Sequence, residues 1–244
     1  MAICLGWFGV GDTPGSRVVE ELRAACSIAN REDIPEVFRV FEQGPGPKGL
    51  AFRREPSKTW TLVLLEGTGS QYAVPAHAAP AWAQALSLRL SRPTMSFFLL
   101  EGGWSYAVFE NGQEVLAQES YTLPTPEVYG DRKRGGDVLG IDPALFDKYE
   151  QALKEGREEP FPGDEFAPND QWGHTDFARH IGLVYPDDPS GGTVYSPSAA
   201  EKLNAGTEWN GLPSRLQAPE PPPHPAAKGE EIDFDKFPSG DDPF

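Results

Sequence analysis

The dipeptide Asn111-Gly112 is the strongest turn signal in the sequence. A two-residue β-hairpin turn needs positive φ at both central positions, and asparagine and glycine accept that conformation most readily. Residues 104–110 and 115–121 flank this turn with strand-like patterns, and residues 94–100 form a third such segment before Gly102-Gly103. These segments predict a three-stranded antiparallel β-meander, which constrains the fold more than any other local pattern.

Further strands and helices are expected around the meander. Apolar runs and turn residues predict strands over 3–10, 50–54, 59–65 and 71–74. Residues 34–42 fit a strand or a short helix, and the strand is favoured. One helix is expected with Thr13 as its N-cap and Pro14 at its first position, and others over 79–90 and from Asp142-Pro143 to Gly156. The predicted fold class is α+β, an antiparallel sheet with a β-meander and a few packed helices, followed by a Pro-rich disordered C-terminal tail.

The composition divides the chain into four parts. Residues 1–156 hold most of the apolar runs and form the predicted α+β domain, and residues 157–212 form an irregular extension with short helices. This extension is expected to pack on the core through Trp172, Phe177, Ile181 and Trp209. Residues 213–228 are a Pro-rich linker of polyproline character. Residues 229–244 are an acidic segment too poor in apolar surface to fold alone, and are expected to be disordered.

The charge distribution argues against direct nucleic-acid binding. The net charge is −16, of which six carboxylates and one lysine place −5 in residues 229–244. A protein that grips phosphates needs clustered lysines and arginines. The one basic cluster, Arg132-Lys133-Arg134, is flanked by acids and is interpreted as a solvated loop. Residues 94–121 contain aromatic rings but no lysine or arginine, so these rings are expected in the core and not on a base-stacking platform.

No catalytic residue, metal ligand or cofactor site is predicted, and the chain is not expected to be an enzyme. His174 with Asp176, or His174 with His180, could form an acid–base or metal pair, but two histidines six residues apart do not share one helix face. Both are interpreted as packing or surface histidines. Gly9-Val10-Gly11 lies between a strand and a helix but lacks the spacing of a dinucleotide-binding turn.

The predicted localisation is cytoplasmic. Cys4 and Cys26 are the only cysteines, which is typical of a protein in a reducing compartment. Residues 1–10 have neither the basic segment nor the small-residue cleavage site of a signal peptide. No apolar run reaches the ~20 residues that a membrane helix needs, so no membrane association is expected.

The C-terminal segment carries the clearest functional signal. It contains Ile232-Asp233-Phe234-Asp235 and ends on Asp241-Asp242-Pro243-Phe244. Acidic residues with interspersed aromatic rings are typical of peptides that become ordered in the groove of a partner. The segment resembles the C-terminal tip of bacterial single-stranded DNA-binding proteins, although residues 236–240, which separate the two motifs, have no counterpart in the usual tip.

This resemblance implies roles for individual residues of the two motifs. Phe244 is expected to place its ring in an apolar pocket and its carboxylate against a basic residue, with Pro243 stiffening the approach. Asp241 and Asp242 are expected to steer the association, and Asp233, Phe234 and Asp235 to make secondary contacts. The predicted function is that of a non-enzymatic accessory protein of DNA replication, recombination or repair. Its partner is a DNA-maintenance protein that recognises such tails.

An alternative places the binding surface on residues 1–156. Trp104-x-Tyr-x-Val-Phe-x-Asn-Gly, Tyr121, Gly135-Gly136-Asp137 and the helix after Asp142-Pro143 resemble modules of uncharacterised bacterial proteins, some of them encoded near toxin–immunity or defence loci. With this resemblance, the acidic body implies an immunity or inhibitor protein that binds a basic toxin or nuclease.

Overall fold

The computed structural model describes residues 4–27, 29, 34–45, 51–55, 57–66, 73–100, 103–119, 127–157 and 159–198. The predicted linker, the acidic segment and Trp209 lie outside these residues. The described fold is that of the N-terminal body and of the extension up to residue 198.

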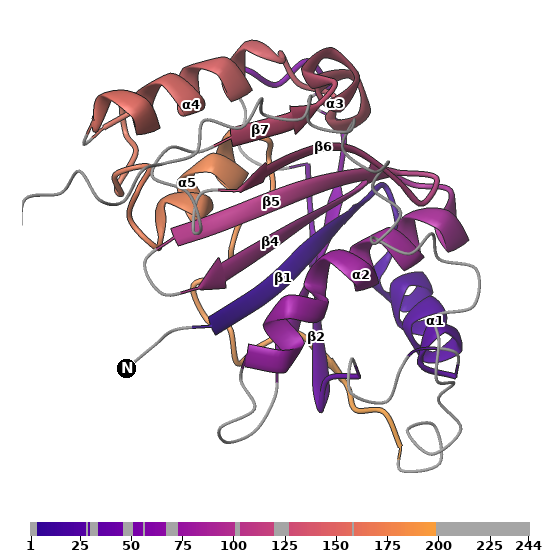
Figure 1. The fold of residues 1–244 in the computed structure, drawn as a ribbon. Coiled ribbons are helices and arrows are strands. Elements are labelled where there is room, and N and C mark those ends of the chain that lie inside the picture. Colours follow the sequence, from indigo (N-terminus) through magenta and orange to yellow (C-terminus); the bar gives the residue numbers. More distant parts are fainter. Residues whose placement is uncertain are drawn as a thin grey trace, which may run out of the picture. The chain divides into compact units, whose positions relative to one another are not determined.

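The described residues form one eight-stranded, fully antiparallel sheet in the order β7-β6-β5-β4-β1-β3-β2-β8 (Figure 1). The strands are β1 (Cys4–Gly11), β2 (Val37–Gln43), β3 (Trp60–Glu66), β4 (Thr94–Leu100), β5 (Gly103–Glu110), β6 (Gln113–Glu119), β7 (Glu127–Gly130) and β8 (Thr193–Tyr195). β4, β5 and β6 are the predicted meander. The α+β class and the antiparallel sheet are confirmed.

Helices cover both faces of this sheet. α1 (Gly15–Cys26) and α2 (Ala73–Leu90) pack on one face, and α3 (Arg132–Leu139), α4 (Ala144–Glu155) and α5 (Gly173–His180) pack on the other (Figure 1). We call the first the N-terminal face and the second the C-terminal face. Among the described helices, none is long and apolar enough to cross a bilayer.

The alternation of side chains along the central strands explains why both faces need a cover. In β3, Trp60, Leu62 and Leu64 belong to the C-terminal core cluster, whereas Val63 and Leu65 belong to the N-terminal one. Successive side chains of a strand point to opposite faces, so a strand that is apolar at every position needs burial on both. Burying such side chains contributes about 2 kcal/mol each relative to exposure.

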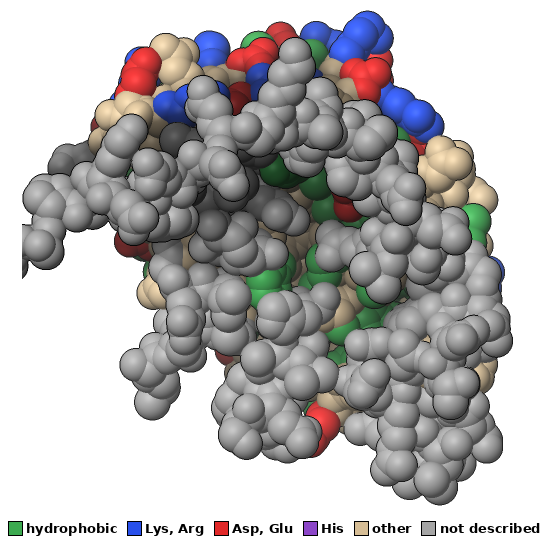
Figure 2. Space-filling model, in the orientation of Figure 1, with side chains coloured by type: hydrophobic (Ala, Val, Ile, Leu, Met, Phe, Trp, Pro, Cys, Tyr) green, Lys and Arg blue, Asp and Glu red, His purple; other side chains and the backbone are tan. Residues whose placement is uncertain are grey.

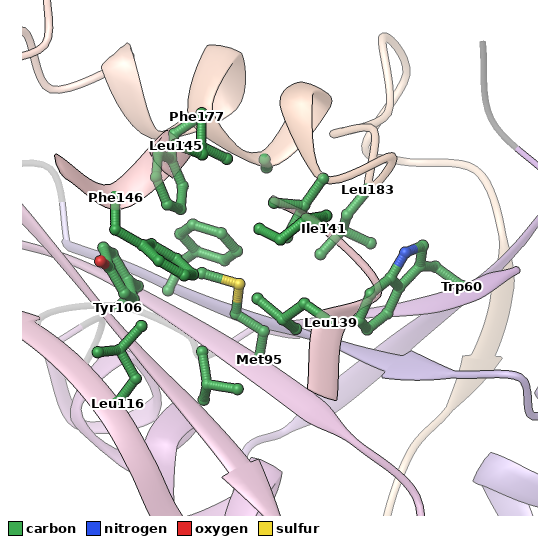
Figure 3. Close-up of a cluster of buried hydrophobic side chains, with 14 of the residues drawn as sticks. Trp60, Met95, Tyr106, Leu116, Leu139, Ile141, Leu145, Phe146, Phe177 and Leu183 are labelled. Atoms are coloured by element: carbon green, nitrogen blue, oxygen red, sulfur yellow. The ribbon is translucent and has the colours of Figure 1, made fainter. Parts of the chain in front are cut away.

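The extension beyond residue 156 helps to cover the C-terminal face. Phe177 of α5 is fully buried and Ile181 is 1% exposed, both in the same cluster as the strand residues, and Figure 3 shows Phe177 directed toward the sheet. Trp104 of β5 donates its indole N–H to the carbonyl of Pro168 at 2.8 Å. This part of the extension therefore contributes directly to the body's core. Trp172, in contrast, is only partly buried.

The start of α1 differs from the expected Thr13 cap. The helix begins at Gly15, and the Thr13 hydroxyl donates to the carbonyl of Gly11 at 2.9 Å instead of capping. The N–H of Gly15 donates to the carboxylate of Glu42 on β2. A carboxylate at a helix N-terminus accepts from free N–H groups and meets the positive end of the helix dipole. The cap therefore comes from a residue distant in sequence, and the Thr13 prediction is wrong.

Three other local predictions are wrong. Residues 51–54 are a turn in which Arg53 makes an isolated bridge to Ile141, because Phe52 is buried between other elements and not along a strand. Ala73 and Val74 begin α2, since Pro75 falls in the first helical turn, where its missing N–H costs little. The Arg132-Lys133-Arg134 segment begins helix α3, because the carboxylate of Asp131 accepts from the N–H of Arg134 at 3.0 Å.

The hairpin turn gives a test of backbone strain. Asn111 and Gly112 have φ of 50° and 76°, as the turn requires, and a Cβ at Gly112 would lie 2.9 Å from that of Leu88. Gly112→Ala is expected to lower the free energy of unfolding by about 2 kcal/mol, from the positive φ and the steric contact together. Urea denaturation measures this loss.

Gly156 provides the matched control. Its φ is 63°, but a Cβ there would meet nothing within 4 Å. Gly156→Ala is expected to cost about 1 kcal/mol, from the backbone conformation alone. Equal losses in the two variants would contradict the steric contribution at the hairpin.

Candidate functional site

The residues predicted to bind a partner, Asp233, Phe234, Asp235, Asp241, Asp242, Pro243 and Phe244, lie outside the described residues. The candidate site among the described residues lies in the body. It consists of His174 and His180 with their acidic neighbours, the N-terminus of α1, the basic start of α3 and two hollows at one end of the sheet.

His174 lies in an enclosure of aromatic rings. It is fully buried, and its ring centroid lies 5.6 Å from that of Trp7 and 5.7 Å from that of Trp172, with Phe97, Trp104 and Tyr185 also around it. Its Nδ1 lies 2.8 Å from the carbonyl oxygen of Gln171, which makes Nδ1 the protonated nitrogen. Burial lowers the pKa of His174 to about 4, so the ring is neutral at physiological pH. The sequence left packing and surface roles open for His174, and its complete burial assigns it to packing.

Asp176 does not form an acid–base pair with His174. Its carboxylate accepts from the backbone N–H groups of Glu165 at 2.7 Å and Phe166 at 2.8 Å, and pairs with Arg179 at 2.8 Å. The side chain is 5% exposed. Asp176 therefore fixes the loop before α5 to the helix itself, which is a structural task.

Asp164 forms the second buried acidic centre, and His180 belongs to it. The Asp164 side chain has no exposed surface, and one of its oxygens lies 2.8 Å from Nε2 of His180 and 3.1 Å from Arg179. Its other oxygen accepts from the N–H of Phe161 at 3.1 Å. His180 packs against the Phe161 ring, with 4.7 Å between ring centroids. A carboxylate that holds an imidazole can serve acid–base catalysis, but here one contact closes the 161–164 loop on Phe161 and the others tie this loop to Arg179 and His180 of α5.

The two histidines do not converge on a metal. His174 faces Trp7 and His180 faces Phe161, so they belong to different surroundings on the same short helix. Within the described residues, no group of three or more histidine, cysteine, aspartate or glutamate side chains could hold a metal ion.

The N-terminus of α1 is occupied by an acid. Glu42 accepts from Gly15 there, and its Cγ lies 3.0 Å from where a Cβ of Gly15 would be. A dinucleotide site requires this position for a phosphate, at the end of a parallel strand. β1 is antiparallel to both of its neighbours. The Gly9-Val10-Gly11 segment therefore lacks both the topology and the charge of a nucleotide-binding turn.

The basic start of α3 is neutralised by neighbouring acids. Arg132 pairs with Asp147 and Glu150 of α4, Lys133 with Asp137 at 2.6 Å, and Arg134 with Glu110 at 2.8 Å. Figure 2 shows the blue and red side chains interspersed along this edge of the molecule. Cations already paired with carboxylates are poor ligands for a phosphate backbone.

The aromatic strand residues are core. Trp104, Tyr106 and Val108 lie in the C-terminal cluster, and Ala107 and Phe109 in the N-terminal one, each at most 3% exposed. This confirms two-sided packing, and these rings have no surface on which a base could stack.

Two hollows lie at one end of the sheet and share Gln43. The larger one, about 520 Å³, is lined by Gln43, Gly44, Pro45, Val184, Tyr185, Pro186 and Asp187. The smaller one, about 360 Å³, is lined by Asp12, Thr13, Pro14, Glu42, Gln43, Thr59, Trp60 and Thr61. Neither hollow was predictable from the sequence, because their walls come from segments that are far apart in the chain and carry no shared motif.

Comparison with protein-family models, with curated proteins and with solved structures gives no match for this chain.

The buried His174 makes stability dependent on pH. The folded-state pKa of about 4 lies below the ordinary value of 6.5, so between these values the unfolded chain binds the extra proton. The His174 contribution lowers the free energy of unfolding by up to about 3 kcal/mol as pH falls from 6.5 to 4, and is absent above 6.5. Urea denaturation of the protein and of His174→Phe across this range measures it. The difference between the two unfolding free energies should change with pH, and parallel curves would contradict the assignment.

The Asp164 centre is tested by removing its charge. Asp164→Asn keeps the size of the side chain but removes the anion beside His180 and one of the two anions beside Arg179, and is expected to cost about 2–3 kcal/mol of unfolding free energy. Asp147→Asn, which removes a carboxylate whose side chain is 63% exposed, is the matched control and should change stability by less than about 1 kcal/mol. Chemical denaturation measures the free energy of unfolding of both variants. Similar losses of unfolding free energy would mean that the buried contacts of Asp164 contribute no more than the exposed pair of Asp147.

Proposed function

We propose that this chain is a non-enzymatic accessory protein of DNA replication, recombination or repair. In this proposal, residues 229–244 dock it to a protein that also recognises the tails of single-stranded DNA-binding proteins. The observation that carries the proposal is the pair of motifs Ile232-Asp233-Phe234-Asp235 and Asp241-Asp242-Pro243-Phe244. The proposal places the protein in the cytoplasm, where such partners act.

The chemistry of the segment suits a partner with an apolar pocket and a basic rim. The Phe244 ring supplies apolar area that is lost from water on binding, and its terminal carboxylate pairs with a cation. Asp241 and Asp242 add long-range attraction, which speeds association and weakens as salt screens it. Pro243 restricts the backbone next to the anchor and lowers the entropy cost of ordering it.

The described body supports a protein partner over nucleic acid. The cations of its basic cluster are paired, its aromatic strand residues are buried, and an acid caps α1. The segment 229–244, with a net charge of −5, would repel a phosphate backbone. Contact with DNA is therefore proposed to be indirect, through the partner.

Removal of Phe244 tests the proposal. A partner isolated on an immobilised tail peptide of a single-stranded DNA-binding protein is titrated with the full chain and with a variant that lacks Phe244. We expect at least tenfold weaker binding without Phe244, because both the ring and the correctly placed carboxylate are lost, and unchanged thermal unfolding of the body. Two glycines added after Phe244 should have a similar effect, because they displace the carboxylate.

Phe237→Ala is the matched control, since Phe237 lies in the stretch that the tail family lacks. It should change the affinity less than about twofold. Unchanged affinity of the chain without Phe244 contradicts the proposal. A chain without residues 229–244 that still captures a basic toxin or nuclease would instead support the acidic immunity or inhibitor protein.

A further inference from the structure

We draw no further inference here: the strongest candidate, the apolar surface at the outer edge of the sheet along β8, where Val194 is 52% exposed, carries no proposal, because nothing in the described part of the chain shows what covers it.

Discussion

The apolar character of both faces of the central sheet is the constraint on which the rest of the described structure depends. The middle strands carry large buried side chains on each face, including Trp7 and Phe8 next to one another on β1. α1 and α2 bury one face. The other face is covered by segments that follow the meander, from Leu139 to Leu183. The extension is therefore part of what makes the sheet stable, and a body that stopped near residue 156 would expose Trp7 and Phe97 to water.

Local sequence patterns predicted the parts of the fold whose causes are local. The Asn111-Gly112 turn depends on the conformational freedom of two adjacent residues, and β3 depends on an uninterrupted apolar run. The failures have distant causes. Glu42, 27 positions from Gly15, caps α1 and replaces the expected Thr13. The segment around Phe52 looked like a strand because it is apolar, but its neighbour Arg53 pairs in isolation with Ile141, near the start of α4.

The residues of the candidate site also divide into those with local causes, which the sequence predicted, and those with distant causes, which it did not. The sequence left His174 and His180 as packing or surface histidines, because a spacing of six does not place two histidines on one helix face. The structure resolves this for His174, which is fully buried among aromatic rings. The partners of Asp176 could not be foreseen, since the backbone N–H groups of residues 165 and 166 approach this carboxylate only after the loop folds over the helix. The contacts of Asp164 with Arg179 and His180 depend on the same placement of the loop. Gln43 gave no local signal either, as an isolated glutamine near a glycine-proline turn does not indicate that its amide pairs with Val184.

The charged groups around α5 and at the start of α3 use their bonding capacity within the fold itself. Asp164 and Asp176 are buried and bound to backbone N–H groups and to Arg179. If either carboxylate took part in a reaction, the loop before α5 would lose the contacts that hold it to the helix. The cations at the start of α3 are paired across to α4 and β5. These charged groups therefore act mainly in stabilising the C-terminal face, because each of them is already bound within the fold.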